Sequence, residues 1–186
     1  MFILGSVRGF FYKQIPKILI LKLKIKEMAD AIIKTDFGNI KFSLEPDLAP
    51  ETVRNFSKLT KSGFYNGTLF HRVIPGFMIQ GGDPNTKNSD KSMWGQGGPG
   101  YNLKAEFSSR SHLRGFVSMA RATDPDSAGS QFFIVTSDST FLDRQYTVFG
   151  EVIDGMEVAD KIVNLPRDGN DCPEQEAKML EVVISE

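Results

Sequence analysis

After Met28, short runs in which apolar and polar residues alternate follow one another along most of the chain. A period of two is typical of β-strands that bury one face. The first two runs, 31–36 and 40–45, are joined by Phe37-Gly38-Asn39 and predict a hairpin. Further runs rich in β-branched and aromatic residues predict strands at 68–74, 77–80, 116–120, 131–136, 146–153 and 179–184.

Two segments have the helical period instead. The first begins at Ala49-Pro50-Glu51-Thr52, where a proline and an acid suit a first turn, and ends at Gly63. The second covers 155–163, whose apolar residues recur on one face. Gly150, inside a strand, predicts a kink or bulge. Many short strands with two helices indicate a mainly β domain, either a barrel or a sandwich.

Residues 1–27 have a different character. They hold six basic residues and one acid, a net charge of +5, so the other 159 residues carry −6 of the total of −1. Lysines keep every apolar run far below the roughly 18–20 residues that span a bilayer, and no secretory signal is recognisable. We expect a basic extension outside the fold and one domain at 28–186. The alternatives are a weak amphipathic strand and a basic membrane-surface or organelle-targeting segment.

Composition narrows the classes of function. The content of 40% hydrophobic and 24% charged residues suits one globular domain of this length. The body of the chain has no basic excess, which argues against nucleic acid as a partner. Cys172 is the only cysteine, so no intrachain disulfide can form, and we interpret it as an ordinary residue near the C-terminus. This is compatible with a reducing compartment, and we expect a cytoplasmic monomer without a membrane span.

The most informative stretch runs from Tyr65 to Gly82. Asn66-Gly67 is a tight-turn dipeptide, and Pro75-Gly76 separates two predicted strands. The second strand is expected to separate Phe77 and Ile79 from Met78 and Gln80. An arginine and a glutamine among large apolar side chains are typical of a shallow site with an apolar floor. In the first strand, a period of two predicts one face with Leu69, His71 and Val73 and another with Thr68, Phe70, Arg72 and Ile74.

Other kinds of chemistry find little support in the sequence. Ser118 or Ser130 could be combined with His71 or His112 into a hydrolase triad, but no nucleophile-elbow sequence accompanies them. No His/Cys/Asp cluster has metal-ligand spacing, and His71 lies in an apolar run, as packed core histidines do. The glycines at 95–100 neither follow a strand nor open a helix, which argues against a dinucleotide fingerprint.

An apolar patch beside Arg72 and Gln80 suits isomerisation of an X–Pro bond. The barrier of roughly 18–20 kcal/mol comes from amide resonance, and no bond is broken, so neither nucleophile nor metal is needed. As the amide twists, the lone pair of the prolyl nitrogen localises and accepts a hydrogen bond. A guanidinium there would bind the transition state more strongly than the ground state. Because arginine stays charged, activity is expected to be nearly independent of pH around neutrality.

The same stretch, 65–82, resembles the signature of the cyclophilin family of peptidyl-prolyl isomerases. The resemblance extends over roughly residues 30–186. Its further parts are Val117-Ser118-Met119-Ala120-Arg121-Ala122, the segment 126–133, Phe141-Leu142-Asp143 and Thr147-Val148-Phe149-Gly150.

The resemblance implies a fold and a set of roles. The fold is a closed eight-stranded antiparallel β-barrel capped by two α-helices. Arg72 would be the catalytic residue, with Gln80 and Gln131 positioning the substrate backbone, and no metal or cofactor would be required. The backbone of Arg121 would pair with the bound peptide, and Ala120 and Ala122 would edge a neighbouring groove. The floor of the proline pocket would be Phe77, Met78, Phe133 and Leu142.

Three positions depart from the family pattern. Many members have tryptophan where this chain has Phe141, and the indole N–H donates to cyclosporin, so weaker binding of the drug is expected. Tyr146 stands where a histidine is familiar, and Arg121 replaces an asparagine. Neither change removes the proposed chemistry.

Two functions of different classes are left open. The first is an active isomerase that acts on proline-containing peptides and on unfolded or folded client proteins, and so assists folding. The second is a chaperone or scaffold module that binds proline peptides and turns them over only incidentally. The presence of Arg72 together with Phe77, Gln80 and Phe133 favours the first, because a pure binding module could lose the arginine.

Overall fold

The computed structural model describes residues 29–185, so the prediction for 1–27 lies outside the described residues. This part of the chain is mainly β, as predicted, with eight strands and two α-helices. No helix within it is both long and apolar enough to cross a membrane. The helices are α2 (Pro50–Lys61) and α3 (Met156–Val163). The strands are β1 (Asp30–Thr35), β2 (Gly38–Leu44), β3 (Phe70–Ile74), β4 (Met78–Gly81), β5 (Phe116–Met119), β6 (Phe132–Val135), β7 (Val148–Asp154) and β8 (Met179–Ser185).

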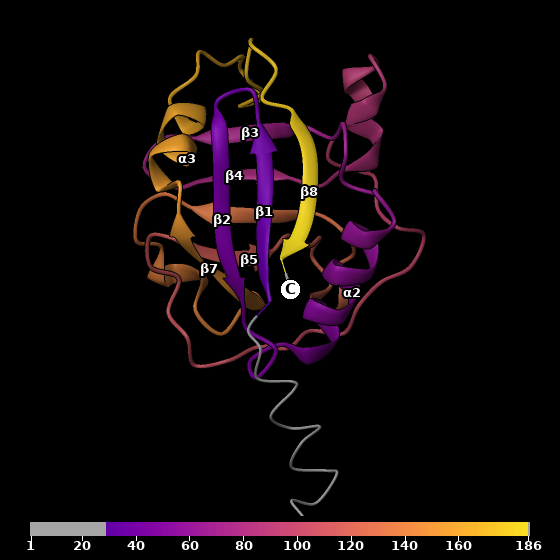
Figure 1. Cartoon of the computed structure of the whole chain (residues 1–186), viewed down its shortest axis with the longest axis vertical. Helices are drawn as coiled ribbons and strands as arrows, with labels where there is room; N and C mark the ends of the chain where they lie inside the picture. Colours follow the sequence, from indigo (N-terminus) through magenta and orange to yellow (C-terminus); the bar gives the residue numbers. More distant parts are fainter. Residues whose placement is uncertain (1–28, 186) are drawn as a thin grey trace, which may run out of the picture.

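All eight strands belong to one antiparallel sheet in the order β3-β4-β6-β5-β7-β2-β1-β8. The sheet curls strongly, so that β1, β2 and β8 cross over β3 and β4 (Figure 1). The predicted hairpin is formed by β1 and β2. At its turn Thr35 pairs with Gly38, and the φ of Gly38 is 128°. The predicted bulge at Gly150 is also present, because the β5–β7 register skips one residue of β7 beside it.

The predicted closure of the barrel is wrong. The end strands β3 and β8 share no ladder, and the sheet stays an open half-barrel. Between these edges there is only an isolated bridge from Leu69 to Lys178, supported by neighbouring hydrogen bonds such as Met179 N–H to the Thr68 carbonyl at 2.8 Å. The physical reason is that β8 crosses β3 instead of running alongside it (Figure 1), so the two end strands meet at one corner only.

The interior of the half-barrel is an aromatic core. The Phe56 ring, on α2, lies 5.0–5.8 Å from the rings of Phe42, Tyr65, Phe132 and Phe149. These five side chains are almost entirely shielded from solvent. Helices α2 and α3 flank the strands on opposite sides (Figure 1). The centre of the half-barrel is therefore occupied by packed aromatic side chains.

The predicted alternation in β3 is also wrong. The register with β4 shifts between Phe70 and Arg72, and this irregularity turns the strand. As a result Phe70 and Val73 both enter the aromatic core, although they are three residues apart. Arg72 is exposed, and His71 is buried, as expected for a packed histidine. Burial also lowers the pKa of His71.

Candidate active site

A second apolar cluster lies on the outer face of β4, β6 and β5, apart from the aromatic core. We call it the outer cluster. Adjacent residues of β6 divide between the two, because Phe132 belongs to the core and Phe133 to the outer cluster. The buried members of the outer cluster are Met78, Phe116, Phe133, Val135, Leu142 and Val148, and its partly buried members are Ile74, Phe77, Ala120 and Tyr146.

One cross-strand row places polar groups directly beside this cluster. Arg72 of β3 pairs with Gln80 of β4, Gln80 pairs with Phe133 of β6, and Phe133 pairs with Ser118 of β5. Side chains in register across an antiparallel sheet point to the same face. The guanidinium and the amide therefore stand next to the apolar side chains that the sequence singled out.

Arg72 is only loosely held by its one partner in the described part of the chain. Its Nε lies 3.9 Å from Oδ2 of Asp171, beyond hydrogen-bond distance, and its side chain is 45% exposed. Asp171 lies closer to Arg167, whose Nε is 3.2 Å from Oδ1. The Asp171 backbone is fixed to β3, because its carbonyl accepts the Val73 N–H at 2.8 Å. The terminal nitrogens of Arg72 thus remain available to a ligand.

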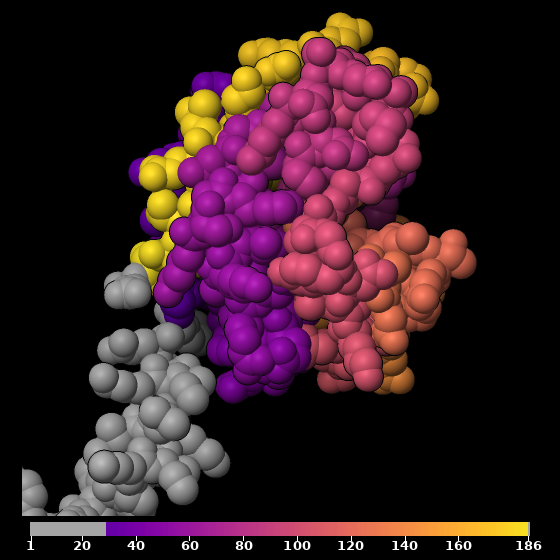
Figure 2. Space-filling view, turned by 90° about the vertical axis from the view of Figure 1, so that its right-hand side faces the viewer, coloured from indigo at the N-terminus to yellow at the C-terminus, as the bar shows by residue number. Residues whose placement is uncertain are grey.

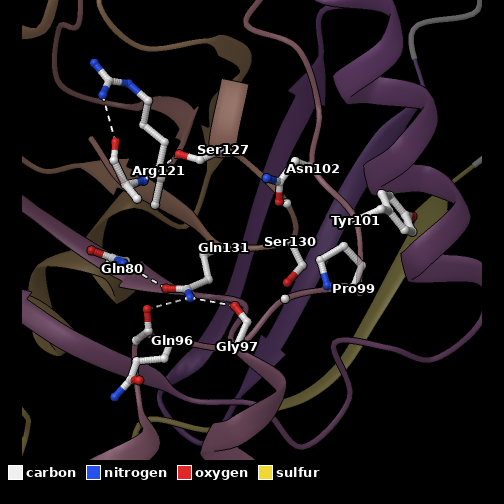
Figure 3. A pocket seen from close by; sticks show the side chains of 16 residues that line it. Gln80, Gln96, Gly97, Pro99, Tyr101, Asn102, Arg121, Ser127, Ser130 and Gln131 are labelled. Atoms are coloured by element: carbon white, nitrogen blue, oxygen red, sulfur yellow. Dashed lines mark hydrogen bonds between the residues drawn. The ribbon is translucent and has the colours of Figure 1, made fainter. Parts of the chain in front are cut away.

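Gln131 orients Gln80. The Gln80 Nε2 donates to Oε1 of Gln131 at 3.0 Å, while the Gln131 Nε2 donates to the carbonyls of Gly95 and Gly97 at 3.0 and 2.8 Å (Figure 3). Both hydrogens of the Gln131 amide have acceptors, and its oxygen has a donor. The Gln80 oxygen has no partner within residues 29–185 and is left to accept a hydrogen bond.

The loop that holds Gln131 is itself fixed by a fully buried carboxylate. Asp83 accepts hydrogen bonds from the backbone N–H groups of Asn85, Gly95 and Gly97. A Cβ at Gly97 would overlap Oδ1 of Asp83, which explains why a glycine is needed there. The glycine-rich stretch is therefore a built wall of the site and not a nucleotide-binding loop.

Beside the outer cluster lies a groove of about 730 Å³ between the loop at 95–102 and the segment 120–131. It runs between the pink and the orange segments in Figure 2. Ala120 and Ala122 line it, as predicted for residues that edge a neighbouring groove. The Arg121 side chain turns away from it (Figure 3), donates to the Gln145 carbonyl at 3.1 Å and lies 4.5 Å above the Tyr146 ring.

Phe141 forms the exposed rim of the outer cluster. Its side chain is 65% exposed, and its ring lies 5.4 Å from that of Phe77. The neighbouring Leu142 is buried in the cluster. The structure thus gathers the predicted floor and rim residues in one place, with Ala122 and Gln131 in the adjoining groove.

Sequence reasoning considered His112 and Ser118 only as parts of a hydrolase triad and missed that they support this cluster. His112 is fully buried, stacks on Phe133 and makes hydrogen bonds to Asp143 and Ser118. The spacing of these residues along the chain has no recognisable motif. The only available signal was a histidine six residues before a serine in a predicted strand.

Comparisons with known proteins all point to one family. Residues 31–184 match the family described as "Cyclophilin type peptidyl-prolyl cis-trans isomerase/CLD". A probable peptidyl-prolyl cis-trans isomerase of Brucella suis is 45% identical over 158 residues, which cover 82% of this chain and 81% of that protein. The crystal structure of a Cryptosporidium parvum cyclophilin-type isomerase superposes with a TM-score of 0.78 at 36% identity, covering 86% of this chain and 98% of that one. A second structure of the C. parvum isomerase, solved in the presence of the dipeptide Ala-Pro, has a TM-score of 0.77, also at 36% identity, and covers 84% of this chain and 99% of that one.

The match spans nearly all of the described residues and includes both the outer cluster and the row from Arg72 to Phe133. This chain therefore belongs to the cyclophilin family of peptidyl-prolyl cis-trans isomerases.

Proposed function

We propose that Arg72 catalyses the isomerisation and that the outer cluster receives the proline ring. The observation that carries this proposal is the row in which Arg72, Gln80 and Phe133 are paired across three strands. A pyrrolidine ring resting on Phe133 and Met78 would bring its nitrogen toward the neighbouring strand that bears the guanidinium. No other exposed arginine pairs in register with a strand of this cluster within residues 29–185.

Catalysis then follows from where charge develops. In the planar amide the nitrogen lone pair is delocalised into the carbonyl, and on twisting it localises on nitrogen. A free donor close to that nitrogen stabilises the twisted state and gains little in the planar ground state. Arg72 meets this requirement because its terminal nitrogens are unengaged and its charge does not depend on pH near neutrality. The reaction requires no bond cleavage and no cofactor.

The substrate backbone has polar partners on either side. The Gln80 oxygen can accept an N–H of the peptide. The backbone N–H and carbonyl of Arg121 have no partner in the described part of the chain, whereas Ala120 N–H donates to the Gln131 carbonyl. An extended segment could therefore pair with Arg121 at the edge of the groove. The Ala-Pro dipeptide used with the C. parvum isomerase supports a proline peptide as the ligand here.

The proposal is tested by the cis–trans exchange rate of a short X–Pro peptide, measured by NMR exchange spectroscopy with substoichiometric protein. We expect exchange far faster than the unaided tens to hundreds of seconds. Peptide signals that shift on binding while the exchange rate stays at the unaided value would instead identify a proline-peptide binding module. If the protein accelerates this exchange, client proteins whose folding it assists can be sought next.

Phe141→Trp should strengthen cyclosporin binding and leave peptide turnover nearly unchanged. The exposed rim position would present an indole N–H that phenylalanine lacks, and one added hydrogen bond contributes about 1 kcal/mol, or roughly fivefold in affinity. Titrating both proteins with the drug by calorimetry measures the difference. Phe141→Leu serves as the control that keeps the wall apolar without the donor, and equal affinities for the tryptophan and wild-type proteins would contradict the prediction.

A further inference from the structure

Three aromatic rings form the back wall of the outer cluster. The imidazole of His112 lies 6.2 Å from the Phe133 ring at an interplanar angle of 17°, so the two rings are stacked. Tyr146 meets both edge-on, with its centroid 6.4 Å from that of His112 and 5.8 Å from that of Phe133. Because His112 is fully buried, it contacts the wall from behind and cannot touch a bound peptide.

Hydrogen bonds hold the imidazole from both nitrogens. Nδ1 lies 3.2 Å from Oδ1 of Asp143, and Nε2 lies 3.1 Å from Oγ of Ser118. Asp143 also accepts the His112 backbone N–H at 2.8 Å and the Ser111 hydroxyl at 2.7 Å. The carboxylate is therefore fixed, and it directs the Nδ1 hydrogen toward itself.

The chain of bonds resembles a hydrolase triad, but it cannot act as one. Ser118 is completely buried in β5, which is paired with β6 on one side and β7 on the other. An acyl substrate cannot reach its hydroxyl. The hydrogen-bonded group of Asp143, His112 and Ser118 must therefore affect the side chains around it and not a substrate.

Counting hydrogens shows two stable arrangements of this network. The Ser118 hydroxyl has one hydrogen and two acceptors in reach, Nε2 of His112 and the Thr147 carbonyl at 2.9 Å. When His112 is neutral, the hydroxyl donates to Nε2, and the Thr147 carbonyl still has the Met119 N–H at 2.9 Å. When His112 is protonated, Nε2–H donates to the hydroxyl, which then donates to Thr147. Protonation of His112 thus turns the O–H of Ser118 from Nε2 toward the Thr147 carbonyl. This change takes place next to Phe133, because Ser118 is the residue of β5 that pairs with Phe133.

The charges around His112 decide which arrangement prevails. Asp143 and the phenol of Tyr146 are the titratable groups that contact it. Arg121 lies over the Tyr146 ring, and Arg110 lies over the ring of Phe116. Burial lowers the pKa of His112, and the Asp143 carboxylate opposes this only in part. The neutral arrangement is therefore the one present at neutral pH.

We propose that neutral His112 positions the Phe133–Tyr146 wall of the proline pocket, and that protonation of His112 loosens this wall and weakens substrate binding. The proposal rests on the proposed function, since it assumes that the outer cluster receives proline. An imidazolium in an apolar cluster is poorly solvated, so its protonation favours rearrangements that admit water. The wall holds the proline ring equally in ground and transition states, so KM should change while kcat stays nearly constant.

The first test measures the response of the aromatic wall to pH by NMR and does not depend on activity. His112 and His71 are the only histidines in the chain, so their imidazole NMR signals are assigned with one variant. We expect the ring signals of Phe133 to shift with the same apparent pKa as the His112 signal, and not with that of His71. Linkage adds a reciprocal result, because a peptide that prefers the neutral form must lower the pKa of His112 when it binds.

The second test is the pH profile of turnover from about pH 7.5 to below about pH 5.5, because histidine ordinarily changes charge between these values and burial moves the transition of His112 to lower pH. For wild type we expect KM to rise about fivefold over this range, the lower end of typical coupling between two sites. His112→Gln should remove this rise, whereas the matched control His71→Gln should keep it. Asp143→Asn, which retains an oxygen for the backbone N–H, should move the rise to lower pH because the carboxylate no longer favours the imidazolium.

The outcomes separate this proposal from the function on which it rests. A His112 titration that leaves the Phe133 ring signals unmoved, or an acid rise in KM that persists in His112→Gln, overturns the positioning role while isomerase activity stands. If Phe133 follows His112 but no X–Pro peptide is turned over at any pH, the proposed function fails, and the coupling of the wall to His112 is still established.

Discussion

Arg72→Ala is expected to lose about 10²–10³-fold in kcat, the usual effect of removing one fixed donor from a developing charge. Peptide affinity should change far less, because the proposed floor for the proline ring and Gln80 both remain in place. The physical reason is that the guanidinium is needed only when the nitrogen lone pair localises. Exchange spectroscopy at several peptide concentrations separates the effect on kcat from that on KM.

Two further arginine variants make this result specific. Arg72→Lys keeps the charge but loses the planar fork, so its activity should fall between those of wild type and alanine. Arg167→Ala removes the guanidinium on the other side of Asp171 and should leave kcat within about twofold of wild type, as surface changes away from the chemistry do. Equal acceleration by wild type and Arg72→Ala would show that the pocket works without the arginine.

Phe132→Ala and Phe133→Ala, one residue apart on β6, are expected to impair different properties. The first should mainly lower stability, and the second should mainly weaken substrate binding. The Phe132 ring lies 5.8–6.5 Å from those of Phe56, Tyr65, Phe70 and Phe149, so its removal leaves an enclosed cavity. A loss of about 3–5 kcal/mol in the free energy of unfolding is expected, which lowers Tm by roughly 10 °C.

Phe133 is also buried, but it belongs to the outer cluster and not to the aromatic core, so we expect a smaller loss of stability than for Phe132→Ala. The proline ring loses its floor, however, and about 2 kcal/mol of binding corresponds to a rise of roughly thirtyfold in KM. Thermal unfolding followed by circular dichroism and the exchange assay are run on both proteins. If both lose stability equally and Phe133→Ala keeps its KM, the outer cluster is part of the core and not a pocket.

Local patterns in the sequence predicted most of the elements. Period-two runs placed the strands, Pro50 and Gly63 bounded α2, and Gly150 marked a bulge, because each depends on residues close together in the chain. The outer cluster was predictable through family resemblance, since the motif carries its residues. Burial of His71 followed from its apolar neighbours.

Features that depend on distant segments were not predictable in this way. The shift between Phe70 and Arg72 arises from pairing with β4, so the β3 sequence alone gives regular alternation. The missing ladder between the end strands β3 and β8 depends on how these two strands cross. Asp83 became the anchor of a loop twelve residues away only through the fold. The contact between His112 and Asp143 likewise joins residues 31 positions apart.

Arg72 lies on β3, an end strand of the open sheet. This position affects which substitutions can change the turnover of the enzyme. A strand with one neighbour opens at a lower free-energy cost than a central strand. On its outer side β3 is restrained by the backbone bond from Val73 to Asp171 and by the bridge at Leu69. The position of Arg72 is thus set partly by the loop around Asp171. Substitutions that shift the Asp171 backbone can therefore change turnover without altering any side chain that meets the peptide, whereas Arg167→Ala leaves the bond from Val73 to that backbone in place.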